Sequence, residues 1–137
     1  MKKLRILIAD DINIIAESYK KIVLKKDNIE VVAISNNGED EYNKIIALKP
    51  DIVITDNQMP KMNGIEVIQK ILDSNIEKKP KFILVTGDIS LFVKYNKLNI
   101  SILYKPVKEE SLLRQLDDIE DQMRNNEDYI KNEKITN

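Results

Sequence analysis

The chain of 137 residues contains no cysteine, no histidine and no tryptophan. Without cysteine it cannot form disulfides, use a thiol nucleophile or bind a metal through sulfur, and this is compatible with a reducing cytoplasm. Without histidine it cannot build Ser–His catalysis or a histidine-ligated metal site. Any general base in this protein must therefore be Asp, Glu, Lys or Tyr.

An excess of one charge sign and long hydrophobic runs are also lacking. Lys and Arg number 22 and Asp and Glu number 23, and the two signs are mixed along the chain. This pattern offers no basic surface for nucleic acid. The basic N-terminus leads into an apolar run that is too short for a signal peptide, and no later run approaches membrane-spanning length. We therefore expect a cytoplasmic protein that binds neither nucleic acid nor membrane directly.

Five apolar segments of β type alternate with five amphipathic helical segments. The expected strands cover residues 4–9, 31–34, 52–54, 82–85 and 100–104. Apolar side chains recur at helical spacing over residues 15–26, 42–48, 65–72, 91–98 and 112–123. Such alternation is typical of an α/β fold with a parallel sheet, helices on both faces and right-handed crossovers.

The apolar pattern also sets a domain boundary. It continues to Met123 and then fails in a charged segment that begins around Asn125 and Asn126. We therefore predict one domain over residues 1–123, of a length that can bury a core. Residues 124–137 are predicted to form a charged C-terminal tail, either a frayed helix or a disordered linker.

Polar side chains stand at the C-terminal ends of four expected strands. Asp10 and Asp11 end the first, Asp56 the third, Thr86 the fourth and Lys105 the fifth. In a parallel sheet these ends share one edge, which is where open α/β sheets bind ligands. Three close carboxylates repel one another and favour a bound cation, and an all-oxygen ligand set suits Mg²⁺. A carboxylate beside Mg²⁺, a lysine and a hydroxyl is also a plausible phosphoryl acceptor.

Each of these residues has a simpler interpretation when it is taken alone. Asp10 and Asp11 before a helix are typical of an N-cap, and Asp56 of a turn. Thr86 and Lys105 could simply end their strands. Separate structural roles do not explain why all four strand ends carry complementary chemistry, so we favour a joint site.

The ordered set of residues resembles the receiver domain of two-component response regulators, over roughly residues 4–123. The resemblance is carried by Asp10-Asp11, Asp56 with Met59-Pro60 and Gly64 after it, Thr86, and Lys105-Pro106. It implies a flavodoxin-like, doubly wound, five-stranded parallel sheet with strand order 2-1-3-4-5. In this family the Lys-Pro peptide bond is usually cis.

The resemblance also implies roles for the residues at the strand ends. Asp56 would accept a phosphoryl group from a sensor histidine kinase, whose histidine supplies the imidazole that this chain lacks. Lys105 would pair with the phosphoryl group, and the Thr86 hydroxyl would move to bond it. The implied ligands of Mg²⁺ are Asp10 through a water, Asp11, Asp56 and the backbone carbonyl of Gln58.

The output of such a receiver would be a face formed by the fourth helix, fifth strand and fifth helix, which would bind a downstream effector or a second copy. The basic residues expected there are mixed with acids and favour polar recognition over an apolar interface; they are Lys94, Lys97, Lys108 and Arg114. One position departs from the family, because Ile102 stands where an aromatic switch residue is common. We expect Tyr104 or Tyr95 to substitute, or the switch to run through the backbone after the fourth strand.

Three functions remain open at this point. The chain is expected to be a phosphoacceptor switch, with self-phosphorylation and autodephosphorylation as its only chemistry. It could instead be the N-terminal receiver of a DNA-binding transcriptional regulator whose output domain lies elsewhere. A Mg²⁺-dependent phosphatase with an aspartyl-phosphate intermediate is a third hypothesis. Enzymes that resemble the haloacid-dehalogenase group use a second carboxylate two positions after the nucleophilic aspartate. Two positions after Asp56 this chain has Gln58.

Overall fold

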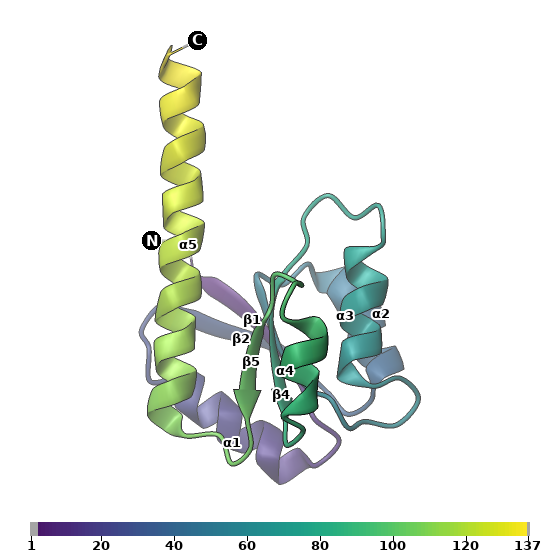
Figure 1. Cartoon of the computed structure of the whole chain (residues 1–137). Coiled ribbons are helices and arrows are strands. Elements are labelled where there is room, and N and C mark those ends of the chain that lie inside the picture. The colour runs from purple at the N-terminus through teal and green to yellow at the C-terminus, as the bar shows by residue number, and fades with distance from the viewer. Residues whose placement is uncertain (1–2, 137) are drawn as a thin grey trace.

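The computed structural model describes the backbone of residues 3–136 and the side chains of residues 3–126. Strands and helices alternate along the whole chain (Figure 1). The strands are β1 (Leu4–Ala9), β2 (Ile29–Ser35), β3 (Ile52–Asp56), β4 (Lys81–Thr86) and β5 (Ser101–Tyr104). The helices are α1 (Asn13–Val23), α2 (Gly38–Leu48), α3 (Gly64–Leu72), α4 (Ser90–Tyr95) and α5 (Glu109–Thr136). All strand pairs are parallel and their order is β2-β1-β3-β4-β5, which confirms the predicted fold.

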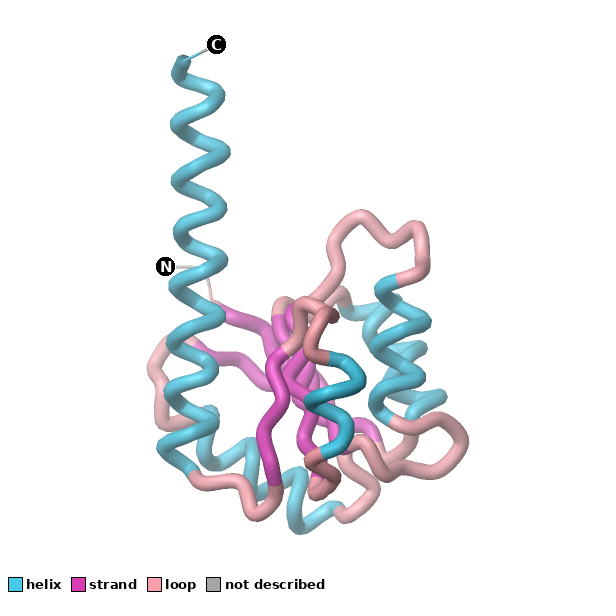
Figure 2. The backbone as a smooth tube through the Cα atoms, viewed as in Figure 1, coloured by secondary structure: helices cyan, strands magenta, loops and turns pink. Residues whose placement is uncertain are grey.

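Helices cover both faces of the sheet. α1 and α5 lie on one face, and α2, α3 and α4 lie on the other (Figure 1, Figure 2). In β1, Ile6 and Ile8 join the core under α1 and α5, whereas Leu7 joins the core under α2 and α3. Successive side chains of a strand point to opposite faces, so a strand that is buried on both faces needs an unbroken apolar run. This explains the apolar centres of β1, β3 and β4.

Several element boundaries differ from those expected, and two of the differences have a clear physical cause. α1 ends at Val23 and not at Lys26, because the amides of Lys25 and Lys26 donate to carbonyls three residues earlier and close a tight turn. β2 is longer than expected because it pairs with β1 from Ile29 to Ser35. Strand pairing thus extends an element beyond the residues whose side chains identify it.

Helix α5 packs on the sheet through Leu112, Leu116 and Ile119, which are buried. It begins near the C-terminal ends of the strands and projects beyond the opposite edge of the sheet (Figure 1). The sequence predicted a change at Met123, but the backbone is helical through Thr136. The division into a domain of residues 1–123 and a tail of residues 124–137 stays a prediction, and residues 1–2 and 137 lie outside the described residues.

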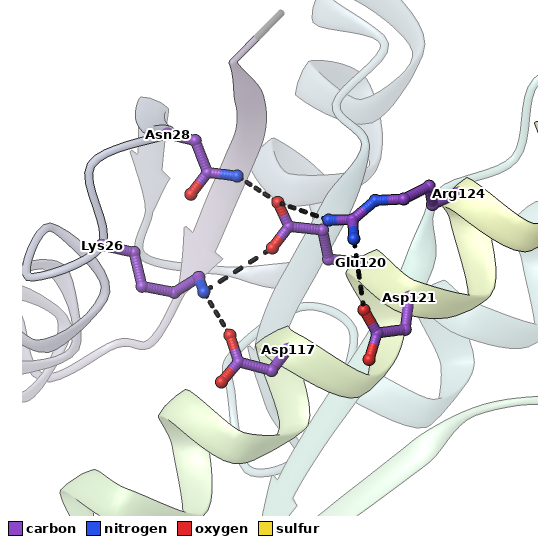
Figure 3. A network of polar contacts seen from close by, with 6 residues as sticks. All are labelled: Lys26, Asn28, Asp117, Glu120, Asp121 and Arg124. Atoms are coloured by element: carbon purple, nitrogen blue, oxygen red, sulfur yellow. Dashed lines mark hydrogen bonds and ion pairs between the residues drawn. The ribbon is translucent and has the colours of Figure 1, made fainter. Parts of the chain in front are cut away.

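A polar network joins α5 to the turn that follows α1 (Figure 3). Lys26 pairs with Asp117 and, at 3.6 Å, with Glu120. Glu120 also accepts from the side chain of Asn28 and lies 4.0 Å from Arg124. Ion pairs near the protein surface contribute little to stability, so we attribute the packing of α5 on the sheet mainly to its apolar face.

Over residues 3–136, no helix is both long enough and apolar enough to cross a membrane.

Candidate functional site

Asp56 is the last residue of β3 and is buried, with 3% of its surface exposed. β3 is buried along its whole length and lies between β1 and β4, so it is a central strand. The chain leaves the sheet directly afterwards, where the Asn57 amide donates to the Val85 carbonyl at 2.9 Å. The Asp56 carboxylate is thus held at the C-terminal end of a buried, central strand.

The loop after Asp56 folds back tightly onto it. The Asn57 side chain accepts from the Ile65 amide, and the Asn57 carbonyl accepts from the Gly64 amide at 3.0 Å. A β-carbon on Gly64 would lie 2.7 Å from the Asp56 carbonyl oxygen, so a glycine is needed for this close approach. Asn63 and Glu66 form a capping box that starts α3 at this point.

Three carboxylates converge at this edge. Asp10, Asp11 and Asp56 each contribute an oxygen, and these oxygens lie within 4.8 Å of one another. Asp10 is buried and Asp11 is exposed. Asp10 Oδ1 accepts from the Ile12 amide at 2.9 Å, but Ile12, and not either aspartate, is the N-cap residue of α1. Neither aspartate therefore has the N-cap position that was considered for it on sequence grounds.

Burial and the neighbouring negative charges disfavour the ionised form of Asp10. Burial raises the pKa of Asp10, and the charges of Asp56 and Asp11 add to the effect, while the Ile12 amide and Lys105 oppose it. Asp10 Oδ2 is buried and has no hydrogen-bond partner among the residues that the structure describes. An orphaned carboxylate oxygen beside two further carboxylates fits a hard divalent cation such as Mg²⁺.

Lys105 approaches Asp56 from the end of β5. Its Nζ lies 3.0 Å from Asp56 Oδ1, and the Lys105–Pro106 peptide bond is cis, as the resemblance implied. The Lys105 amide donates to the Thr86 carbonyl, and the Thr86 hydroxyl accepts from the Asp88 amide at 3.0 Å. A pocket of about 470 Å³ opens here, lined by Asp56, Asn57, Gln58, Thr86, Gly87, Asp88 and Lys105. Asp56 is therefore part of the acidic cluster and also lines the pocket that contains Lys105 and Thr86.

The structure brings the five predicted side chains of the strand ends to one edge of the sheet. Gln58 lies in the same pocket, with its backbone amide 3.4 Å from Asp56 Oδ1. Nothing in this arrangement assigns a role to the Gln58 carbonyl. The individual roles of all six residues stay predictions.

Sequence reasoning missed two polar residues around Asp56. Tyr19 was taken only as part of the apolar face of α1, yet burial and the charges of Asp10 and Asp56 raise its pKa to about 12. Glu41 is fully buried and contacts Thr55, the residue before Asp56. The spacing of Glu41 and Ile45 on α2 was the available signal, because it places a carboxylate on the buried face of the helix.

Ile102 occupies the position on β5 where the family commonly has an aromatic switch residue. Ile102 is partly buried and packs with the core on the α4 side of the sheet. Tyr104 is the register partner of Thr86 and lies on the same face of the sheet as Ile102, as strand alternation predicted. Tyr104 is 36% exposed. The tyrosine next to the threonine therefore stands at the surface.

Comparison with protein families gives one matching family model, described as the response regulator receiver domain, over residues 6–117. Two curated relatives align with most of the chain. A protein-glutamate methylesterase/protein-glutamine glutaminase of Clostridium acetobutylicum is 32% identical over 87% of this chain and 35% of its own length. The uncharacterized transcriptional regulatory protein YesN of Bacillus subtilis is 30% identical over 84% of this chain and 32% of its own length. The chain spans about a third of these relatives.

Solved structures with the same fold include chains from two response regulators. The REC domain of AraT, a response regulator from Geobacillus stearothermophilus, superposes with a TM-score of 0.79 at 25% identity, over 90% of this chain and 98% of that one. A DNA-binding response regulator of the LuxR family from Staphylococcus aureus gives 0.75 at 28% identity, over 85% and 98%. Both likenesses cover nearly the whole of the solved chains.

Proposed function

This chain belongs to the response regulator receiver family, and we propose that it is a phosphorylation-controlled switch whose phosphoacceptor is Asp56. The proposed donor is the phosphohistidine of a sensor histidine kinase, and the proposed location of this chain is the cytoplasm. One observation carries the proposal: the buried Asp56 carboxylate lies within 4.8 Å of the Asp10 and Asp11 oxygens and 3.0 Å from Lys105 Nζ. A nucleophile, a cation site and a fixed positive charge are what phosphoryl transfer to a carboxylate requires.

In the proposed step, an Asp56 carboxylate oxygen attacks the phosphorus of the donor. The new P–O bond forms as the P–N bond breaks, and the electron pair of the P–N bond stays on the imidazole nitrogen. Lys105 then pairs with a phosphoryl oxygen, because the Asp56 carboxylate has lost its charge on becoming part of an acyl phosphate, a mixed anhydride. The Thr86 hydroxyl lines the same pocket and would donate to another phosphoryl oxygen.

The acidic cluster supports a bound Mg²⁺. Asp11, Asp56 and the Gln58 carbonyl would hold the ion, and Asp10 would reach it through a water. When bound, Mg²⁺ neutralises charge on the transferring oxygens. The unpartnered Asp10 Oδ2 would gain a hydrogen bond from that water, which removes the cost of leaving a buried acceptor unpaired.

Phosphorylation would be read on the face formed by α4, β5 and α5, by a downstream effector or a second copy. The expectation that this face is polar is wrong in part. Around α4, three large apolar side chains are exposed: Ile89 by 72%, Val93 by 73% and Phe92 by 51%. Apolar contacts therefore contribute to the proposed interface. Tyr104 replaces the usual aromatic in this proposal, because it lies beside Thr86 on the same face of the sheet.

The length of the relatives favours a receiver that works with further domains. A transcriptional regulator and a methylesterase are among them, and this chain matches about a third of each. We propose that any DNA contact or ester hydrolysis in such a system belongs to another domain, and that this chain supplies the switch alone.

The proposal is tested with a small acyl phosphate as donor in the presence of Mg²⁺. We expect one phosphoryl group per chain, and hydroxylamine should remove it as it removes an aspartyl phosphate. Mass spectrometry after reduction of the acyl phosphate should locate the modification at Asp56. Continuous release of phosphate from many phosphate esters, far beyond one equivalent per chain, would instead favour the phosphatase hypothesis.

Asp11→Ala should weaken Mg²⁺ binding by about tenfold or more, because it removes a direct oxygen ligand from the proposed site. Calorimetric titration of both proteins with Mg²⁺ measures the effect. Asp118→Ala is the matched control, since it removes the same charge from an exposed position of α5. An affinity of Asp11→Ala equal to that of the control would remove Asp11 from the metal site.

A further inference from the structure

Glu41 is a carboxylate in the apolar core between α2 and the sheet. None of its surface is exposed, although it lies on the fourth position of an otherwise polar helix start. Glutamate is almost never fully buried unless it is paired, because removing its charge from water is costly. Its presence at this position therefore needs a physical explanation, and phosphoryl transfer at Asp56 as described above does not use it.

The contacts of Glu41 lead directly to the phosphoacceptor. Thr55 Oγ1 lies 2.9 Å from Glu41 Oε1 and 3.4 Å from the carbonyl oxygen of Asp56. A hydroxyl carries one hydrogen and cannot donate it to two acceptors. Both contacts become hydrogen bonds if Glu41 is a carboxylic acid that donates to Thr55, because the Thr55 hydrogen is then free for the Asp56 carbonyl.

The surroundings of Glu41 favour the neutral acid. Burial raises the pKa of Glu41 to about 8, and the hydrogen bond that Thr55 can donate to an ionised Glu41 opposes this only in part. No cation pairs with Glu41 among the described residues, and its Oε2 has no hydrogen-bond partner there. The nearby charges of α2 and of the loop after β3 are partnered at the surface, in the pairs Lys44–Asp40 at 2.8 Å and Lys61–Glu39 at 4.0 Å.

Helix α2 also contacts the loop that follows Asp56 in the chain. The Gly38 amide donates to the Pro60 carbonyl at 3.2 Å. A β-carbon on Gly38 would lie 1.9 Å from the Met62 carbonyl oxygen, so the start of α2 touches the backbone of the loop. α2 thus contacts the strand just before Asp56, through Glu41, and the loop just after it, through Gly38.

We propose that Glu41 is a positioning residue for phosphoryl transfer: as a carboxylic acid it donates to Thr55, Thr55 donates to the Asp56 carbonyl, and this Glu41–Thr55 link fixes the backbone that carries the phosphoacceptor. The inference rests on the proposed function. Loss of the Glu41 proton leaves two acceptors competing for one Thr55 hydrogen. Ionisation of Glu41 also places an unpaired negative charge in the core, next to the strand that carries Asp56. Phosphorylation of Asp56 therefore becomes slower as Glu41 ionises.

Glu41→Gln is the informative variant, because a glutamine has nearly the same shape, keeps a donor and does not titrate. The rate constant for labelling of Asp56 by an acyl phosphate at saturating Mg²⁺ is measured for both proteins from about pH 6.5 to 9.5. We expect the ratio of the variant rate to the native rate to be constant below about pH 7. It should then rise by about threefold or more, with a midpoint near the Glu41 pKa of about 8.

Two threonine variants test the other half of the link. Thr55→Val removes the hydroxyl at almost constant volume and should slow labelling already at neutral pH. Thr55→Ser keeps a hydroxyl and should restore most of the rate. Equal rates for the valine and serine variants would overturn the proposal, because the hydroxyl would then have no part in positioning Asp56.

Thermal and urea unfolding of the native protein and Glu41→Gln separate positioning from stability. Glu41 has a raised pKa in the folded state, so the stability that its neutral form contributes is lost as the pH rises from its ordinary pKa of 4.5 to about 8, and is level above that. The inference is overturned if the stability changes with pH in this way while the ratio of the variant and native labelling rates stays constant over the whole pH range. Glu41 would then be a structural residue only. Failure of the native protein to be labelled at any pH would overturn the proposed function itself, and the inference with it.

Discussion

Asp56→Asn should reduce phosphoryl labelling of the chain by at least about 100-fold, to the background of the assay. The asparagine amide has no nucleophilic oxygen with a negative charge, and it cannot form the acyl phosphate. The fold should persist, because the amide fills the same space at the end of β3 and Gly64 still meets the carbonyl of residue 56 as a backbone group. Labelling with a radioactive acyl phosphate in Mg²⁺ measures the effect.

Asp88→Asn is the matched control for this experiment. Asp88 lines the same pocket, is exposed and undergoes the same chemical change, but it lies after β4 and outside the acidic cluster. We expect it to be labelled to the same stoichiometry as the native protein. If Asp56→Asn were labelled as fully as Asp88→Asn, the phosphoacceptor would be another residue.

Gly38→Ala should destabilise the protein by about 3 kcal/mol or more, and it could prevent folding of this chain at moderate temperature. The new β-carbon would lie 1.9 Å from the carbonyl oxygen and 2.6 Å from the carbonyl carbon of Met62. Both atoms belong to the backbone, so no side-chain rotation relieves the contact, and α2 must separate from the loop after β3. Urea unfolding followed by circular dichroism measures the loss.

The other two glycines provide a graded comparison. A β-carbon on Gly87 would have no atom of the described part of the chain within 4 Å, so Gly87→Ala should change stability by no more than about 1 kcal/mol, in the stabilising direction. Gly64→Ala meets the Asp56 carbonyl oxygen at 2.7 Å and should fall between these two. A Gly38→Ala protein as stable as Gly87→Ala would show that α2 does not rest on this loop.

Much of the fold follows from local patterns in the chain. Runs such as residues 52–54 are apolar and β-branched on consecutive positions, which is typical of a strand that is buried on both faces. The helical stripes between the strands, and the position of Asp56 at the end of such a run, require no knowledge of distant contacts. For the same reason the alignment of Asp10, Thr86 and Lys105 at one edge followed from the parallel arrangement alone.

Other features depend on which side chains meet across the fold. The exposure of Phe92 and Val93 on α4 could not be predicted, because apolar residues at helical spacing normally indicate a buried face. The sequence left open whether the segment after Met123 is a frayed helix or a disordered linker, because it carries no apolar stripe, and the backbone is helical through Thr136. Backbone hydrogen bonds can extend a helix through residues that have no apolar face.

The sequence by itself determined the α/β class, the five-fold alternation and the set of polar residues at the strand ends, because each depends on neighbours along the chain. Only the tertiary structure decided that Glu41 reaches Thr55, that Gly38 touches the Met62 backbone and that Asp56 is shared between a carboxylate cluster and a lysine. These contacts join segments that are distant in the chain. Their energies depend on burial and on atom-to-atom distances that no local pattern encodes.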